Sequence, residues 1–227
     1  MHPFAAAAPT NAAPDSTAAL TQRIAAVLPQ TQCTRCGYPD CNAYALAIAQ
    51  GVAAINQCPP GGAQGVARLA AITGQAPLAL NPAHGSENPR SLAVIDEDWC
   101  IGCTLCIKAC PTDAIVGIHK RMHTVIAEHC TGCELCVPAC PVDCIALENA
   151  SGTATGWAAW SETQQKHAQQ RYQARTQRLA RGAAPPVEAS TVRSSEAART
   201  ATHSDTKRSA VAAALARARA QRASLPR

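Results

Sequence analysis

The fold of this chain is decided by CIGCTLCIKACPTDAIV at residues 100–116 and by its near-copy CTGCELCVPACPVDCIA at residues 130–146. Both stretches follow the order Cys-x2-Cys-x2-Cys-x3-Cys-Pro, and ten of their seventeen paired positions are identical. This spacing is typical of domains that hold two iron–sulfur clusters. The sequence therefore predicts a duplicated cluster-binding domain with the two runs at its centre.

Each of the two clusters is expected to take its cysteine ligands from both runs. Three cysteines at positions i, i+3 and i+6 can wrap three corners of a cubane, but the fourth ligand has to come from elsewhere. In two-cluster ferredoxins the fourth cysteine of each run ligates the cluster of the other run. We therefore assign one [4Fe–4S] cluster to Cys100, Cys103, Cys106 and Cys140, and the other to Cys130, Cys133, Cys136 and Cys110. Two zinc sites and thiols without metal are the alternatives, and the repeated spacing counts against both.

A third group of cysteines precedes the duplicated runs. It follows the order Cys-x2-Cys-x4-Cys-x16-Cys, at Cys33, Cys36, Cys41 and Cys58. A helix is expected over residues 41–50, capped by Asp40, and a second helix is expected to open at the Gly61-Gly62 pair. Two of these cysteines then lie at or just before helix N-termini, whose partial positive charge favours an anionic cluster. We expect a [4Fe–4S] cluster here, with a structural zinc site or unmetallated thiols as the alternatives.

The remaining sequence predicts an α+β fold built around these cysteine groups. The expected order is a disordered arm at 1–16, a four-cysteine module at 17–74, a linker at 75–91, a two-cluster ferredoxin domain at 92–150, a helical extension at 151–181 and a basic, largely disordered tail at 182–227. Helices are expected at 17–28, 41–50, 61–72 and 157–181. Short strands are expected at 92–95, 114–118, 122–127 and 144–147, paired as two equivalent hairpins.

Composition restricts the class of protein further. Hydrophobic residues make up 47% of the chain but aromatic residues only 3%, so its small core needs a covalent or metal staple. Thirteen cysteines, an odd number, together with no recognisable secretory signal, argue against an extracellular disulfide framework. The chain also offers no run of about eighteen apolar residues for a membrane-spanning helix. We expect it to work in the reducing cytoplasm.

The net charge of +5 is unevenly distributed along the chain. Residues 1–150 hold 7 Lys/Arg against 11 Asp/Glu, a net charge of −4, whereas residues 151–227 hold 13 against 4, a net charge of +9. A basic tail can bind anionic lipid, because each Lys or Arg near such a surface contributes about 1 kcal/mol. A solvated, disordered extension is nevertheless expected, with lipid binding and nucleic-acid binding as the alternatives, and little aromatic interleaving supports the last of these.

Several polar residues near the runs are candidates for roles beyond ligation. Cys144 corresponds to Ala114 in the first run, so we expect a small buried apolar residue, with a ligand or redox-sensing role as the alternative. Asp113 and Asp143 are expected to be turn or cap residues. For His129, a solvated side chain is expected, and a hydrogen bond to a cluster sulfur is the alternative.

The His119-Lys120-Arg121 segment is expected to form the tip between the two halves of the domain. A docking patch for an acidic partner is one interpretation of its charge. The chain contains no phosphate-binding glycine loop, no Gly-x-Ser-x-Gly elbow and no His-Glu-x-x-His motif. No catalytic residue is therefore expected, and the sequence indicates an electron carrier without a substrate pocket of its own.

The order of the two cysteine modules resembles that of one family. TQCTRCGYPDCNAYALAIAQGVAAINQCPPGG at residues 31–62, placed ahead of a two-cluster ferredoxin, resembles the B subunit of the Rnf/Rsx electron-transport complex, and the resemblance covers about residues 16–150. It implies one [4Fe–4S] cluster in the first module and two in the second. It also implies an intermediate position between a soluble low-potential donor and a membrane-bound ion-translocating complex. Family members usually begin with a membrane-spanning helix, where this chain has an Ala/Pro-rich arm. We expect a cytoplasmic protein, with peripheral contact with the cytoplasmic face of the inner membrane through the basic tail as the alternative.

These observations favour an iron–sulfur protein that relays electrons through three [4Fe–4S] clusters as the B subunit of an Rnf-like oxidoreductase. Its expected partners are the other subunits and a soluble donor. One alternative is a stand-alone soluble polyferredoxin that donates electrons to another reductase. A zinc-binding nucleic-acid adaptor, which would use the basic tail, is the other.

Overall fold

The computed structural model describes residues 16–183 of the chain. The predicted arm at 1–16 and the predicted basic tail at 182–227 lie outside the described residues, apart from the residues at their edges. Within residues 16–183, no helix is both long and apolar enough to cross a lipid bilayer.

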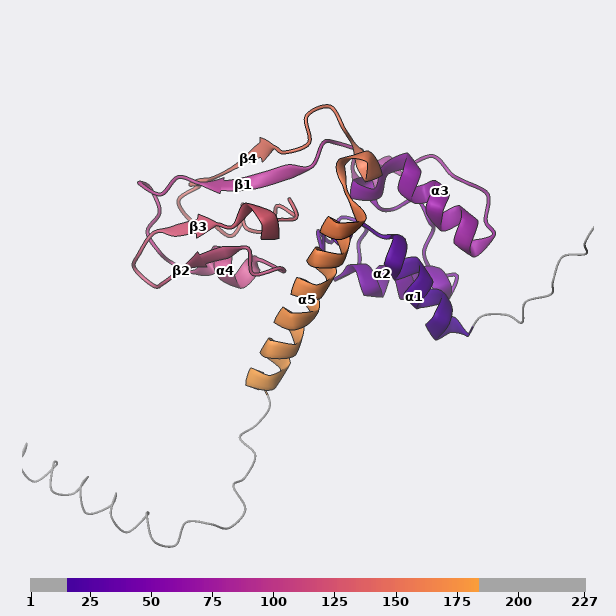
Figure 1. The fold of residues 1–227 in the computed structure, drawn as a ribbon, viewed down its shortest axis with the longest axis horizontal. Helices are drawn as coiled ribbons and strands as arrows, with labels where there is room; N and C mark the ends of the chain where they lie inside the picture. Colours follow the sequence, from indigo (N-terminus) through magenta and orange to yellow (C-terminus); the bar gives the residue numbers. More distant parts are fainter. Residues whose placement is uncertain (1–15, 184–227) are drawn as a thin grey trace, which may run out of the picture. The chain divides into compact units, whose positions relative to one another are not determined.

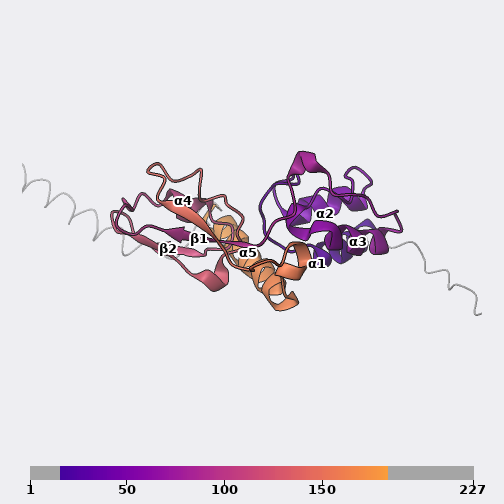
Figure 2. The ribbon, with the colours of Figure 1, turned by 90° about the horizontal axis from the view of Figure 1, so that it is seen from above.

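Three helices, α1 (Thr17–Val27), α2 (Cys41–Ala49) and α3 (Gly62–Thr73), pack together at the N-terminal end and form one core (Figures 1 and 2). The hydroxyl of Ser16 accepts the N–H of Ala19 and starts α1, and the carboxylate of Asp40 accepts the N–H of Ala43 and starts α2. A short 3-10 turn, η1 (Pro59–Gly61), leads into α3. The predicted helices are therefore present with small differences at their ends.

Four short strands and one short helix surround the two cysteine runs. They are β1 (Ser91–Ile95), α4 (Leu105–Ala109), β2 (Ile115–Gly117), β3 (His123–Val125) and β4 (Ile145–Asn149). The strands lie where the sequence predicts them, but the predicted pairing as two hairpins is wrong. β1 pairs antiparallel with β4, and only β2 and β3 form a hairpin. Each two-stranded sheet thus takes one strand from each half of the repeat.

The two sheets are equivalent under the thirty-residue offset of the sequence repeat. The offset takes β1 onto β3 and β2 onto β4, so the β1–β4 sheet corresponds to the β3–β2 sheet. Backbone conformations repeat as well: Gly102 and Gly132 have φ of +67° and +64°. A Cβ at either glycine would collide with the backbone, of Arg121 in one case and of Ser91 in the other. Glycine is required at both positions because the backbone of the other half passes so close.

The C-terminal helix α5 (Glu162–Ala183) begins five residues later than predicted. Trp157 instead lies in a 3-10 turn, η4 (Gly156–Ala159), and is buried against Gly65 of α3. The hydroxyl of Ser161 accepts the N–H of Gln164, and the side-chain oxygen of Gln164 accepts the N–H of Ser161. This reciprocal pair is a capping box, which fixes the helix start at this point.

Residues 75–91, predicted to be a linker, make specific contacts with the helices. Within this segment lies a 3-10 turn, η2 (Pro82–His84). The carboxylate of Glu87 accepts the N–H of Ala63 at the start of α3 and the hydroxyl of Thr155. Glu87 therefore places its negative charge at a helix N-terminus and holds the segment against the N-terminal helices.

Candidate iron–sulfur sites

One small cavity in the duplicated domain is lined by cysteines from both runs. Its walls carry apolar side chains, among them Ile95, Ile101 and Ile145, as well as the ring of His123. The cysteines that line it are Cys100, Cys103, Cys106, Cys140 and Cys144. The first four are the residues that the sequence assigns to one cluster.

A second small cavity has the same construction in the other half of the repeat. Ala93, Ala114, Ile115 and Val125 form its apolar walls. The cysteines that line it are Cys110, Cys130, Cys133 and Cys136. Each cavity thus receives the first three motif cysteines of one run and the fourth motif cysteine of the other run, and the first cavity also receives Cys144.

Backbone N–H groups point at the cysteine sulfurs in both halves. The N–H of Ala114 lies 3.1 Å from the Sγ of Cys110. The N–H groups of Ala93 and His123 lie 3.5 Å and 3.4 Å from the Sγ atoms of Cys130 and Cys100, which are equivalent cysteines of the repeat. Such donors favour the thiolate over the thiol and so favour a negatively charged cluster.

Burial raises the pKa of three of these thiols, those of Cys106, Cys133 and Cys136, and makes them poorer acids in the absence of a metal. It raises the pKa of Cys133 to about 12 and that of Cys136 to about 11. A thiol with such a pKa stays protonated at neutral pH, and iron has to displace the proton when the cluster is built. Within residues 16–183, no three Cys, His, Asp or Glu side chains close around a single ion. The thiol-rich, apolar lining of each cavity, with backbone N–H groups directed at its sulfurs, fits an iron–sulfur cluster.

The third cysteine group lies between α1, α2 and α3. Cys33 and Cys41 are buried, and Cys36 and Cys58 are partly buried. Burial raises the pKa of Cys41, and the charges of Cys58, Cys33 and Cys36 raise it further, so the four sulfurs lie within electrostatic reach of one another. The structure therefore brings the four predicted residues of this module together.

Two buried glutamines position this cysteine group, and the sequence gives no obvious sign of their role. The side-chain oxygen of Gln32 accepts the N–H of Cys41 at 2.9 Å, and its amide donates to the side-chain oxygen of Gln30 at 2.8 Å. Gln30 in turn donates to the carbonyl of Ala25 in α1. Both glutamines are 2% exposed, so this chain of bonds ties the cysteine loop to two helices.

Comparison with known proteins identifies both cysteine modules. Residues 93–147 match the family model described as "4Fe-4S dicluster domain", and residues 28–60 match the one described as "Putative Fe-S cluster". Similar curated proteins include the B subunit of the ion-translocating oxidoreductase complex of Azoarcus sp. (strain BH72), which is 60% identical over 138 residues, covering 61% of this chain and 75% of that protein. The B subunit of Thiobacillus denitrificans is 61% identical over 109 residues (48% and 58%), and that of Hahella chejuensis is 53% identical over 139 residues (61% and 70%).

The chain belongs to the family of B subunits of the ion-translocating oxidoreductase complex. The resemblance to the Rnf B subunit is thereby confirmed. As a member of this family it is an iron–sulfur electron-transfer protein, with one Fe–S module followed by a dicluster domain. The matches favour iron–sulfur clusters over the zinc alternative in both cysteine groups.

In this B subunit, the cavity lined by Cys100 has a neighbour that the other cavity lacks. The Sγ of Cys144 lies 3.5 Å from the Sγ of Cys140. Burial opposes ionisation of Cys140, but the N–H groups of Val142 and Cys144 and the thiol of Cys144 lower its pKa. Burial and the adjacent Cys140 raise the pKa of Cys144. Cys144 is therefore buried, as predicted, and its S–H is placed to donate to Cys140 whenever that cysteine, assigned as a ligand, is a thiolate.

His123 is the second neighbour of that cavity, and it is not among the candidate residues predicted from the sequence. It is 1% exposed, and its Nδ1 lies 3.4 Å from the Sγ of Cys106 while its Nε2 has no partner among the described residues. Protonation on Nδ1 provides an N–H···S hydrogen bond, whereas protonation on Nε2 would bury an N–H without an acceptor.

The repeat shows why a ring fits at position 123. Opposite His123 on β2 lies Gly117, where a Cβ would collide with the ring. The equivalent pair in the other sheet is Ala93 and Leu147. The large and small residues are exchanged between the two halves, and this exchange in the sequence is the signal that could have identified His123.

His129 differs from its expectation. It is partly buried, its ring stacks on that of His167 with 5.2 Å between centroids, and neither ring nitrogen makes a described hydrogen bond to sulfur. Burial lowers the pKa of His129, and the charges of Arg171 and His167 lower it further. The prediction of a solvated histidine is wrong because α5 covers this face of the domain.

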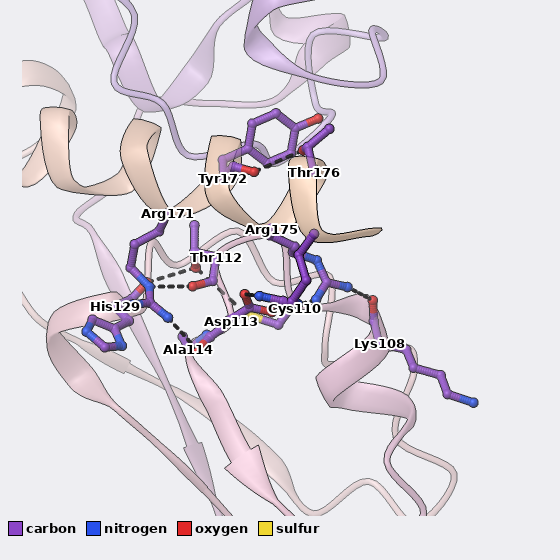
Figure 3. A network of polar contacts seen from close by, with 11 residues as sticks. Lys108, Cys110, Thr112, Asp113, Ala114, His129, Arg171, Tyr172, Arg175 and Thr176 are labelled. Carbon is purple, nitrogen blue, oxygen red and sulfur yellow. Dashed lines mark hydrogen bonds and ion pairs between the residues drawn. The ribbon is translucent and has the colours of Figure 1, made fainter. Parts of the chain in front are cut away.

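Helix α5 binds the turn that follows Cys110 (Figure 3). Arg171 donates to the carbonyls of Thr112 and Asp113 at 2.6 Å and 3.1 Å. Arg175 and Arg178 both pair with the Asp113 carboxylate, at 2.6 Å and 2.8 Å. Burial works to raise the pKa of Asp113, but the hydrogen bonds from these two arginines outweigh it and lower the pKa. Asp113 is a turn residue, as predicted, with a φ of +51°.

The same helix reaches the N-terminal cysteine module. The hydroxyl of Tyr172 donates to the Asp40 carboxylate at 3.0 Å, and Asp40 caps α2 directly before Cys41. One helix therefore contacts the segment next to a predicted ligand in each of two modules. The three arginines, spaced at i, i+4 and i+7, form a basic stripe on α5 that the sequence already contains.

Proposed function

We propose that this protein relays electrons through three [4Fe–4S] clusters as the B subunit of an Rnf-type ion-translocating complex. The supporting observation is the pair of cavities that each combine the first three motif cysteines of one run with the fourth motif cysteine of the other. We assign the first cluster to Cys33, Cys36, Cys41 and Cys58, the second to Cys100, Cys103, Cys106 and Cys140, and the third to Cys110, Cys130, Cys133 and Cys136. Module boundaries at 17–74 and 92–150 are part of the same proposal.

Each cluster, when bound, supplies a centre that gains or loses one electron. The protein's part is to hold and shield these centres. Apolar side chains such as Ile95 and Ile115 exclude water from the cavities, and backbone N–H groups offset the negative charge of the sulfurs. No side chain is required to exchange a proton or to bind a substrate. The chain is accordingly proposed to be a carrier, with any oxidoreductase activity belonging to the assembled complex.

Anaerobic purification and elemental analysis test the cofactor content. Three cubanes predict about twelve iron and about twelve sulfide per chain. Zinc in stoichiometric amounts without sulfide would overturn the proposal in favour of the zinc adaptor. Iron and sulfide near eight per chain would retain the ferredoxin domain and reject a cubane in the N-terminal module.

The proposed partners are the other subunits of the complex and a soluble low-potential donor. We place the protein on the cytoplasmic side, with peripheral contact between the basic segment at 182–227 and anionic lipid. This contact is electrostatic, so the protein should sediment with membranes at low salt and be released at high salt. Recovery of the full chain in the soluble fraction at low salt would contradict membrane contact and favour the stand-alone polyferredoxin.

A further inference from the structure

The two halves of the duplicated domain cover their cluster loops differently. In the second half, Thr131 is 5% exposed and its hydroxyl donates to the carbonyl of Thr31 at 2.9 Å. Glu134 of the same loop pairs with Arg35 at 2.6 Å. Thr31 and Arg35 flank Cys33, so this loop is the contact between the dicluster domain and the N-terminal cysteine module.

The equivalent loop of the first half is uncovered. Ile101 takes the place of Thr131 and is 56% exposed, and Trp99 takes the place of His129 and is 71% exposed. The turn between β2 and β3 adds two more apolar side chains, Ile118 and Met122, which are 67% and 58% exposed. We call Trp99, Ile101, Ile118 and Met122 the apolar patch.

The two parts of the apolar patch lie next to each other. The N–H of Lys120 donates to the carbonyl of Gly102 at 2.9 Å, and the backbone of Arg121 lies against the same glycine. Figure 1 shows the loop after β1 and the turn between β2 and β3 at the same end of the strands. The patch is therefore one surface, formed where the tip of the hairpin meets the cysteine loop.

The composition of the chain makes this exposure informative. The sequence contains only three tryptophans, and one of them, Trp157, is buried in the core. A chain so poor in large apolar residues nevertheless leaves Trp99 and three aliphatic neighbours in water. Contiguous exposed apolar side chains of this kind mark interaction sites, and tryptophan and methionine are enriched at the centres of interfaces.

We propose that the apolar patch is the docking surface for a redox-active subunit of the membrane-bound complex, where electrons leave the cluster held by Cys100, Cys103, Cys106 and Cys140. The inference rests on the proposed function. Ile101 belongs both to the patch and to the wall of that cavity, so a protein seated on it lies beside the cluster. The equivalent loop of the other half, with Thr131 and Glu134, contacts the N-terminal cysteine module. This face of the repeat can therefore bind another cluster-carrying unit.

Charge at the rim of the patch indicates the chemistry of the partner. Lys120 and Arg121 in the turn form no ion pair with any residue that the structure describes. An apolar centre with basic side chains on the hairpin side and acidic side chains before Trp99 fits a redox protein whose own cofactor lies under an apolar surface bordered by both signs of charge. The acidic run Asp96-Glu97-Asp98, directly before Trp99, gives the rim both signs of charge and so favours one orientation of the partner.

This assignment gives the relay an order. The N-terminal cluster neighbours the loop of the Cys130 cluster, and the Cys100 cluster lies beside the open patch. With clusters bound at the three assigned cysteine groups, electrons would pass between the N-terminal module and the docked protein through both ferredoxin sites in sequence.

The proposal is tested with the full-length protein loaded with iron and sulfide. The variant Ile118→Ser/Met122→Ser removes half of the patch without touching a cysteine loop, and Val52→Ser, at a residue 75% exposed in the N-terminal module, is the matched control. The dithionite-reduced proteins are mixed in a stopped-flow instrument with membranes that carry the rest of the complex but lack its B subunit. We expect reoxidation of the patch variant to be at least tenfold slower than that of the wild type and of Val52→Ser. With ferricyanide, which needs no docking surface, all three should react alike.

Two results would overturn the proposal in different ways. A patch variant that reacts with the membranes as fast as the wild type would reject the docking surface and leave the proposed function standing. A loaded wild-type protein that does not react with the membranes at all would reject both. Lys120→Glu/Arg121→Glu provides a second variant that keeps the apolar residues, and it should slow reoxidation most strongly at low salt. Unchanged iron content and EPR spectra confirm that each variant is folded.

Discussion

Replacement of Cys140 by alanine is expected to remove the cluster built on the first cysteine run and to spare the cluster built on the second. Cys140 belongs to the second run by sequence, but it lines the cavity of Cys100, Cys103 and Cys106. Loss of the fourth thiolate exposes one iron corner, so the cluster is lost or converted to a three-iron form. Iron per chain should fall by between about one and about four of about twelve, and EPR of the dithionite-reduced protein should lose one of the three signals.

The repeat provides a mirror-image control for this experiment. Cys110→Ala should damage the centre built on Cys130, Cys133 and Cys136 and leave the other ferredoxin cluster intact. Cys144→Ala changes a cysteine only 3.5 Å from Cys140 and should leave the iron content unchanged. The crossed assignment would be wrong if Cys140→Ala and Cys133→Ala removed the same EPR signal.

The cysteine pattern was predictable because its information is local. Spacing of three residues within a tight loop restricts which sulfurs can meet, and the second run repeats the first, so each half confirms the other. Pairing of the strands was not predictable in the same way. Strands of 3 and 5 residues carry too little pattern to choose a partner. β1 pairs with β4 of the other half, and the fourth cysteine of each run lines the cavity of the other run. Both features follow from the same crossing of the chain from one half of the domain to the other.

Contacts between distant segments account for the other differences. Asp113 is a simple turn residue by sequence, and its three arginine neighbours come from a helix about sixty residues further on. His129 is covered by that same helix, which sequence periodicity cannot place on a particular face. The start of helix α5 was predictable, because the Ser-x-x-Gln pattern at Ser161 and Gln164 indicates a capping box. Trp157, which precedes it, packs in the core and does not belong to the helix.

A change of His123 to leucine is expected to lower the reduction potential of the cluster held by Cys100, Cys103, Cys106 and Cys140. The Nδ1 of His123 lies 3.4 Å from the Sγ of Cys106, and a donor at this position stabilises the reduced cluster more than the oxidised one because the reduced cluster carries more negative charge. If the two states differ by about 1 kcal/mol in this bond, the potential falls by about 40 mV, since about 59 mV corresponds to a tenfold change for one electron. EPR-monitored redox titration measures this shift.

The cluster held by Cys110, Cys130, Cys133 and Cys136 is the internal control for the same titration. At the position equivalent to His123 it has Ala93, whose side chain cannot donate a hydrogen bond to a cysteine sulfur. Leucine fills most of the volume of the ring, so entry of water is limited and the lost hydrogen bond dominates. Cys144→Ala removes the other extra donor and should shift the same cluster in the same direction, and Cys144→Ser, which keeps an O–H donor, should restore most of the potential. Equal shifts of both ferredoxin clusters in His123→Leu would show that the change acts through the fold. An unchanged potential would show that the hydrogen bond from His123 does not influence the cluster held by Cys100, Cys103, Cys106 and Cys140.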